Sequence, residues 1–369
     1  MWLIALIGGA SSFVESTLAQ VYKVKDRDGF RGGPAYYMEL ALNKKKMGVA
    51  FSILISITFG LIFNSVQSNT ISFAFEEAFK LDRTMIGVVL AIATGAIIFG
   101  GVHRIANFSA AVVPVMAVLY IVVSLFVVIK NIHMVPELFN EIVSNAFGLK
   151  QTVGGGLGVV VMTGVKRGLF SNEAGMGSAP NAAATAETTH PVKQGFVQTL
   201  GVFTDTIIIC SCTAFMVLIS GAHKIDGLTG IQLTQKALSS QVGEWGKIFI
   251  AVCILLFAFS SIIGNYYYGE TNIEFLTENR AWLNAYRVGV IGMVMFGAIG
   301  ELVTIWNMAD LFMGLMSILN LIAIFMLGKV AFDALKDYAK QKDEGKDPVF
   351  VKTSIDLPHP ERVEAWDKA

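Results

Sequence analysis

Nineteen residues in the middle of the chain, Gly154 to Asn172, have the pattern of a membrane-spanning helix interrupted by glycine, charge and polar side chains (GGGLGVVVMTGVKRGLFSN). Inside hydrocarbon, a break in a helix leaves backbone N–H and C=O groups without partners. Such a break is tolerated only where it is buried in protein or lines a water-filled cavity. The stretch therefore predicts a binding site at membrane depth, as in a transporter.

The composition is typical of an integral membrane protein. Of the 369 residues, 54% are hydrophobic and 15% are charged, whereas a soluble domain has about 25% charged residues. The formal net charge is zero, so no basic surface for nucleic acid is predicted. The cysteines lie in apolar stretches without metal or disulfide spacing, and we predict no cofactor. The cysteines are Cys210, Cys212 and Cys253.

Nine apolar segments are long enough to cross a lipid bilayer, which takes about 20 residues. We expect every one of them to be helical, which predicts an all-α integral membrane protein. The segments lie at residues 1–22, 48–69, 84–101, 106–129, 152–187, 196–220, 247–269, 284–300 and 303–328.

Charge in the loops predicts the orientation. The loop between Tyr22 and Gly48 is rich in Lys and Arg, and such loops face the cytoplasm. Alternating spans then place the tail from Lys329 in the cytoplasm as well, and its charge-mixed segment KDEGKDP predicts a solvated extension. In the same basic loop, GGPAYYM predicts a tight turn, with Tyr36 and Tyr37 in the interfacial aromatic belt.

Four motifs resemble those of the alanine or glycine:cation symporter family of bacteria and archaea, and the resemblance runs to about Lys336. The motifs are Gly168–Pro180 (GLFSNEAGMGSAP), Gly32–Met38 (GGPAYYM), Asn64–Thr70 (NSVQSNT) and Ala258–Glu270 (AFSSIIGNYYYGE). The resemblance implies a symporter of the cell membrane that carries small neutral amino acids, alanine or glycine, with sodium or a proton.

The resemblance also implies the five-plus-five inverted-repeat fold of the leucine transporter. The opening MWLIALIG is similar to the second half of a family signature, so we expect the chain to lack the first core helix. Residues 1–130 would form an incomplete first repeat of four transmembrane helices. Residues 131–330 would form the second repeat, with an interrupted helix at 152–187 and four more spans, and 331–369 the cytoplasmic tail.

The interrupted helix suits a zwitterionic amino acid, because its half-helix ends offer both free N–H and free C=O groups. Gly164 and Gly168 would permit close approach to its backbone. Ser171 or Asn172 would cap the second half-helix, and Phe170 would wall a small side-chain pocket. The alternative is that the glycines only allow tight helix packing.

Amides and charges within the spans are further candidates. Gln67 and Asn69 are assigned to the substrate, with interhelical hydrogen bonding as the alternative. Lys166 and Arg167 are costly at membrane depth, and they would bind the substrate carboxylate, pair with Glu173, or act as gate or snorkelling charges.

Ser260 and Ser261 are the candidate cation ligands, together with the Phe257 carbonyl one turn earlier. Sodium prefers oxygen ligands. Serines in apolar helices also bond back to their own backbone, and it is the resemblance that favours the ion role. Three isolated acids would be proton or cation sites or satisfied interhelical hydrogen bonds. They are Glu15, Asp205 and Asp310.

Two other classes of protein compete with a transporter. An intramembrane enzyme would need a GxSG, HExxH or paired-acid motif, and the sequence has none, so we expect no enzymatic activity. A relative that does not transport, acting as a sensor or assembly partner, is the remaining alternative.

Overall fold

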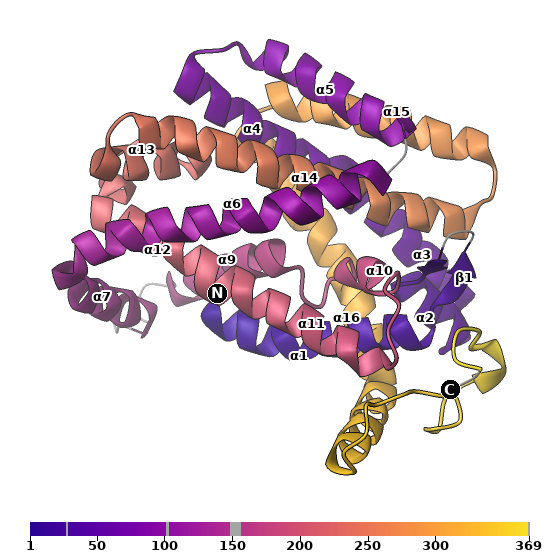
Figure 1. Cartoon of the computed structure of the whole chain (residues 1–369). Coiled ribbons are helices and arrows are strands. Elements are labelled where there is room, and N and C mark those ends of the chain that lie inside the picture. The colour runs from indigo at the N-terminus through magenta and orange to yellow at the C-terminus, as the bar shows by residue number, and fades with distance from the viewer. Residues whose placement is uncertain (27–28, 101–102, 148–155, 368–369) are drawn as a thin grey trace.

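The structure is a computed structural model that describes residues 1–26, 29–100, 103–147 and 156–367 (Figure 1). Its α-helices are α1 Trp2–Val21, α2 Pro34–Leu40, α3 Lys45–Ile55, α4 Asn64–Phe79, α5 Arg83–Gly100, α6 His103–Lys130, α7 Val135–Phe147, α9 Gly156–Asn172, α10 Ala179–Ala183, α11 Pro191–Phe203, α12 Cys210–Ser220, α13 Gly230–Val242, α14 Trp245–Leu276, α15 Arg280–Ile299 and α16 Leu302–Asp343. Two π-helical segments, η1 Ser56–Phe63 and η3 Thr204–Ile209, join α3 to α4 and α11 to α12. Short 3₁₀ turns are η2 Ile132–Met134, η4 Ala222–Lys224 and η5 Pro360–Arg362, and one antiparallel hairpin pairs β1 Val24–Asp26 with β2 Gly29–Arg31.

Eight helices of the described residues are long and apolar enough to cross a membrane. They agree with eight of the nine expected spans. They cover Trp2–Val21, Lys45–Phe79, Arg83–Gly100, Val113–Lys130, Pro191–Ser220, Trp245–Leu276, Arg280–Ile299 and Leu302–Asp343. The ninth expected span, 152–187, begins outside the described residues. Its described part is the 17-residue α9, a break and the short α10.

Large apolar side chains cover the outward faces of several of these helices. On α5, Ile92 is 67% exposed, and on α16, Phe325 is 89% exposed. A soluble monomer does not tolerate such continuous apolar surface, whereas lipid tails are a suitable neighbour for it. The chain is a multi-pass membrane protein.

The helices pack in two groups that α16 connects. One group joins α4 with α5, α14 and α15, and the other joins α1 with α9, α10 and α11 (Figure 1). Helix α16 contacts α1 in one group and α4 in the other. Small residues permit close approach in the first group, because a Cβ added at Gly297 of α15 would collide with the Ser65 carbonyl oxygen of α4.

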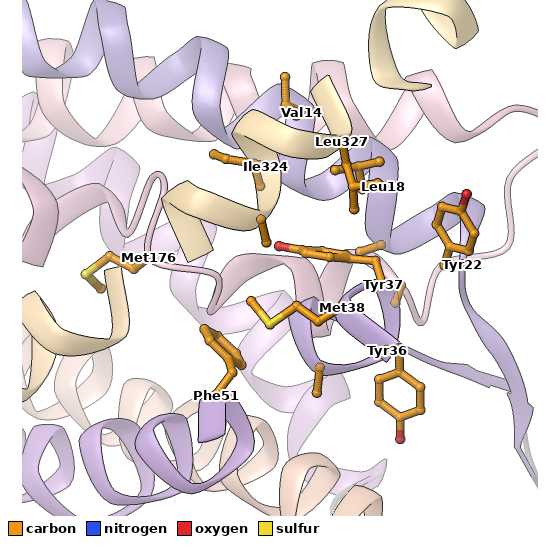
Figure 2. Packing of buried hydrophobic residues seen from close by; sticks show 14 of the residues in the cluster. Val14, Leu18, Tyr22, Tyr36, Tyr37, Met38, Phe51, Met176, Ile324 and Leu327 are labelled. Carbon is orange, nitrogen blue, oxygen red and sulfur yellow. The ribbon is translucent and has the colours of Figure 1, made fainter. Parts of the chain in front are cut away.

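The largest apolar core lies where α1, α2, α3 and α16 meet (Figure 2). Leu18 of α1, Met38 of α2 and Phe51 of α3 are fully buried there. Leu327 of α16 closes the same cluster. Each such side chain contributes about 1.5–3 kcal/mol on burial from water, so this core fixes the relative positions of α1, α2 and α16.

The expectation of a solvated tail is wrong for most of its length. The stretch around Lys342 and Lys346 is exposed, as expected from its charge. Beyond it, however, the chain folds back against the helix bundle and buries four apolar side chains in the largest core. These are Phe350, Leu357, Val363 and Trp366. The expectation of a solvated tail was based on the charged run. The apolar residues that follow this run are not spaced with a helical or strand period, so their spacing does not predict that they are buried.

Candidate functional site

The interruption lies just after the expected stretch. Helix α9 winds without a break from Gly156 to Asn172, and the chain leaves the helix over residues 173–178. Three residues of this segment have positive φ angles: Glu173 at 57°, Gly175 at 83° and Gly177 at 85°. Glycine adopts this left-handed conformation freely. For Glu173 it is unusual and is held only by the surrounding contacts.

The prediction that the stretch Gly154–Asn172 is itself interrupted is therefore wrong over its described part, whereas a break does lie within the span 152–187 that we expected to be interrupted. The reason is helix packing. A Cβ added at Gly168 would meet Ile4 of α1 at 3.1 Å, and one at Gly164 would meet the Met1 backbone nitrogen at 3.5 Å. These two glycines let α9 approach α1 closely, which was the alternative reading. Gly154, where the stretch begins, lies outside the described residues.

A single carboxylate holds the break from the side of α1. Glu15 is fully buried, and it accepts the Gly175 N–H at 3.0 Å and the Gly177 N–H at 3.1 Å. Its Oε2 also accepts the Asn320 amide of α16 at 2.6 Å. All three partners are donors, so both oxygens act as acceptors. This isolated acid of the sequence thus fixes the backbone of the broken helix through hydrogen bonds. We call these contacts of Glu15 the staple.

Asn320 and Tyr37 extend this staple to two more elements. The Asn320 amide donates to the Gly175 carbonyl at 3.0 Å, and its Oδ1 accepts from the Tyr37 hydroxyl. Tyr37 is completely buried, with its ring lying across the core toward α16 (Figure 2). The expectation that Tyr36 and Tyr37 belong to an interfacial belt is wrong, since both are buried as α2 packs under α3.

An aromatic layer lies along α9 before the break. The Phe170 ring packs between Phe63, with centroids 4.7 Å apart, and Trp306, at 4.6 Å. Gln67 follows Phe63 by one helical turn, so it presents its side chain on the same face of that helix. The structure thus brings Phe63, Phe170 and Trp306 together, and Gln67 lies one turn after Phe63.

The two cations of α9 pair with α16. The Arg167 Nη2 lies 2.5 and 2.7 Å from the two carboxylate oxygens of Asp310, and the Lys166 Nζ lies 3.3 Å away. The Arg167 guanidinium also stacks over the Trp306 ring at 4.3 Å from its centroid. The alternative in which these cations pair with Glu173 is wrong. The Glu173 carboxylate accepts the Ser178 hydroxyl at 2.7 Å instead.

Ser171 and Asn172 face the π-helical segment η3 and do not cap a second half-helix. Ser171 donates its hydroxyl to Asp205, and the Asn172 amide donates to Thr206 at 3.0 Å. The Asn172 Oδ1 accepts the Ala174 N–H at 3.1 Å, which begins the turn into the break. Asp205 is therefore not an isolated acid. It belongs to a polar cluster that joins α9 to η3.

Asn69 lies apart from this cluster. Its amide donates to the Gly297 carbonyl at 2.8 Å and to the Gly300 carbonyl at 3.1 Å, at the C-terminal end of α15. Asn64 likewise donates to the Gly60 carbonyl at 2.9 Å. The contacts of Asn69 are those of interhelical hydrogen bonding, which was the alternative to a substrate role.

Three oxygens of α14 converge at the predicted cation ligands. The Ser260 and Ser261 hydroxyls both donate to the Phe257 carbonyl, at 2.8 and 3.0 Å. Hydroxyl protons can rotate away from a carbonyl when a cation binds, leaving oxygen lone pairs toward it. The described residues hold no cluster of His, Cys, Asp and Glu that suits a transition metal. The oxygens present are of the type that sodium takes.

One structural feature and one sequence signal mark further site residues. Both π-helical segments carry site residues, η1 at Phe63 and η3 at Asp205, and π-bulges often mark functional positions. Asn320 lies in the apolar run MSILNLIAIF, where a lone amide predicts a buried partner. Neither pattern identifies the partner, because the donors come from segments far along the chain.

The chain is similar in sequence to known proteins. Residues 1–352 match the family described as the sodium:alanine symporter family. The chain is 58% identical, over 99% of its length and 76% of the relative, to a protein named probable sodium/glutamine symporter GlnT of Bacillus subtilis. It is 55% identical over its full length to the amino-acid carrier protein AlsT of the same organism, of which it covers 78%. It is 37% identical, over 94% of its length and 78% of the relative, to the sodium/alanine symporter AgcS of Methanococcus maripaludis.

Proposed function

Because the chain belongs to the sodium:alanine symporter family, we propose that it carries a small neutral amino acid, alanine or glycine, across the cell membrane together with sodium. Two of the relatives are named as sodium symporters, one of glutamine and one of alanine, and a third as an amino-acid carrier. The proposal adds the size of the substrate, the residues that hold it and the cytoplasmic position of the C-terminus.

One observation carries the proposal: a helix broken at residues 173–178, inside the protein, whose N–H groups are held by the buried Glu15. A helix that ends leaves its last carbonyls without intrahelical partners, and the last bond of α9 runs from the Glu173 N–H to the Leu169 carbonyl. The carbonyls that follow Leu169 are suited to the ammonium of an amino acid. A negative partial charge at a helix C-terminus favours the same group.

The aromatic layer and the ion pair act as one gate over this position. Phe170 lies one turn before the break, and Arg167, which pairs with Asp310 of α16, lies one turn before Phe170 on α9. Opening the gate separates α9 from α16 and frees the Arg167 guanidinium. A guanidinium binds a carboxylate through two parallel bonds, so Arg167 would meet the carboxylate of an arriving substrate. Gln67, on the Phe63 side, would contact the same substrate.

Sodium would bind at the Phe257 carbonyl with Ser260 and Ser261. Binding there exchanges two local hydrogen bonds for ion–oxygen contacts on one turn of α14. Because α14 packs against α4 and η1, a shift of this turn reaches the helix that carries Gln67 and Phe63. Occupancy by sodium and by the amino acid would be coupled through this packing.

Glutamine is a second candidate substrate. It is favoured by the 58% identity to a relative named for sodium/glutamine symport, against 37% for the relative named for alanine. The side-chain amide of glutamine needs a polar partner when buried, and Gln67 would be that partner. Alanine, by contrast, needs only the apolar wall that Phe170 forms.

Uptake by reconstituted vesicles tests the proposal. Labelled alanine, glycine and glutamine are each offered to proteoliposomes with an inward sodium gradient, and with potassium replacing sodium. We expect accumulation of alanine or glycine that requires sodium. Accumulation of glutamine alone would reverse the substrate assignment, and uptake indifferent to sodium would refute the coupling.

Serine variants test the cation ligands. Ser261→Ala is expected to raise the sodium concentration at half-maximal uptake at least tenfold, because one ligand is lost. Ser240→Ala is the matched control, since the exposed Ser240 makes the same kind of local bond, to the Ala237 carbonyl. Equal sodium dependence in the two variants would contradict the assignment.

A further inference from the structure

The C-terminal segment, residues 347–367, is tied to the three helical elements that hold the broken helix. It lies against α2 and the β1–β2 hairpin at one end of the bundle (Figure 1). We call this segment the latch. Glu15 lies on α1, Tyr37 on α2 and Asn320 on α16. The latch contacts the C-terminal ends of α1 and α2, and it follows α16 in the chain.

Apolar burial supplies most of the attachment. Phe350 is 1% exposed and Trp366 is 6% exposed, and both belong to the largest core. The Phe350 ring packs edge-on against Trp366, at 5.4 Å between centroids, and against His190, at 5.3 Å. Such burial in a segment that has no α-helix or strand, only the 3₁₀ turn η5, shows a specific docked conformation, because a solvated tail would not order these rings.

Hydrogen bonds connect the latch to α1. The Trp366 indole N–H donates to the Gln20 carbonyl at 2.9 Å, and the Tyr22 hydroxyl donates to the Pro358 carbonyl at 3.0 Å. The Lys23 ammonium lies 4.9 Å from the Trp366 ring centroid. These bonds are at the C-terminal end of α1, one turn and more beyond Glu15.

Further bonds connect the latch to α2 and to the segment that follows α10. Arg362 donates to the Asn43 side chain at 3.0 Å and to the Glu39 carbonyl at 3.3 Å. The Phe350 N–H donates to the Thr189 carbonyl at 2.8 Å, directly before α11. The C-terminal ends of α1 and α2 and the segment before α11 are thus joined by one short segment.

The attachment is incomplete on one side, which allows release. An open pocket lies under the Trp366 ring, lined in part by Phe30, Glu187 and Thr189. A ring with free space on one side can swing out without displacing a packed helix. The bonds at Lys352 and Asp347 are exposed pairs, and pairs of this kind contribute about 0–1 kcal/mol.

We propose that the latch holds the cytoplasmic end of the transport path closed, and that its release from α1 and α2 is the step that opens this end. The inference rests on the proposed function. Transport by alternating access needs the ends of α1, α2 and α11 to separate, and the latch is the covalent extension of α16 that joins them. A cell could then regulate transport through this segment without contacting the substrate site.

The test uses a buried reporter on α1, one turn before the residue that accepts the Trp366 bond. Ser16 lies one turn before Gln20 on the same face of α1, is fully buried, and has no hydrogen-bond partner for its hydroxyl among the described residues. Ser16→Cys therefore costs no bond. The Ser16→Cys substitution is placed in a variant in which the three native cysteines are replaced by alanine. The rate at which a small charged thiol reagent modifies the new cysteine is then measured in detergent.

Phe350→Ala is expected to raise the modification rate of this cysteine at least tenfold. Val349→Ala is the matched control, because the adjacent Val349 side chain is 39% exposed, and it should stay within twofold of the parent. A Phe350→Ala rate within twofold of the parent, or an equal increase in the Val349→Ala control, overturns the proposal.

A second variant covers the case in which Phe350→Ala does not fold. Trp366→Phe retains an aromatic ring and loses the indole N–H bond to Gln20. It should raise the modification rate at least threefold, and an unchanged rate overturns the proposal. The measurement needs no transport, so an absence of uptake leaves it readable. Sodium-dependent uptake combined with unchanged reactivity refutes the latch alone.

Discussion

The staple formed by Glu15 leads to a quantitative prediction for Glu15→Gln. The carboxylate accepts three hydrogen bonds, from the N–H groups of Gly175 and Gly177 and from the Asn320 amide. In glutamine one oxygen becomes an NH₂ group. The best placement keeps the oxygen where Oε2 stood, facing two of the donors. The NH₂ then faces the Gly175 N–H, donor against donor.

The cost follows from these contacts. Leaving one buried donor unsatisfied costs about 1–3 kcal/mol, and each of the two retained bonds loses about 1 kcal/mol when the charge disappears. The total destabilisation is about 3–5 kcal/mol. For a chain of this size that corresponds to a fall in melting temperature of roughly 4–6 °C. Because the broken segment loses contacts that position its backbone, sodium-driven uptake should fall at least about tenfold, equivalent to about 1.4 kcal/mol.

Thermal unfolding in detergent, followed by the fluorescence of a thiol-reactive or tryptophan probe, measures the first effect. Glu173→Gln is the matched control from the same segment. Its carboxylate accepts one bond, from the Ser178 hydroxyl, and the oxygen of glutamine can accept it equally well, so the melting temperature should change by less than about 2 °C. Equal melting temperatures for the Glu15→Gln and Glu173→Gln variants would refute the staple.

Three further predictions concern the gate, helix packing and pH. Asp310→Asn leaves two unpaired cations on α9 and should reduce uptake at least tenfold, whereas exchanging the charges in an Arg167→Asp/Asp310→Arg double variant should recover part of it; no recovery would refute a gate that depends on the pair. Gly297→Ala should destabilise the protein by about 1–3 kcal/mol through overpacking, and Gly292→Ala, which meets open space on the same helix, should not; similar melting temperatures would contradict the packing. Burial lowers the pKa of His190 from its ordinary value of 6.5, against the opposing effect of Asp337. The unfolded state then binds more protons near that pH, so the melting temperature should fall on acidification from pH 7 to 5, and less steeply in His190→Gln.

Much of the fold follows from local sequence. The apolar stretches are long enough and continuous enough that eight of nine expected spans correspond to helices capable of crossing a membrane. The family motifs also lie on the elements that build the site: NSVQSNT on α4 and GLFSNEAGMGSAP across the break. Both signals are local. The spans depend on the transfer of side chains from water to lipid, which acts residue by residue, and the motifs are short continuous stretches of sequence.

The position of the break needed the tertiary structure. A glycine in a span serves equally to interrupt a helix or to admit a neighbour, and the sequence does not distinguish the two. Gly168 admits α1, while Gly175 and Gly177 take left-handed angles because Glu15 stands opposite to receive their N–H groups. That carboxylate is 160 residues away along the chain, so no periodic pattern connects it to the break.

The same division applies to the charges and to the tail. The sequence determined that a charge at Arg167 is costly at membrane depth. That Arg167 pairs with Asp310 and not with Glu173, which is nearer along the chain, depended on which helix faces α9. It determined that the segment near Lys342 is solvated, but not that Phe350 folds back into the core. Hydrophobicity and charge are properties of single residues and short segments. Which donor meets which acceptor is decided by the packing of whole helices, and that exists only in three dimensions.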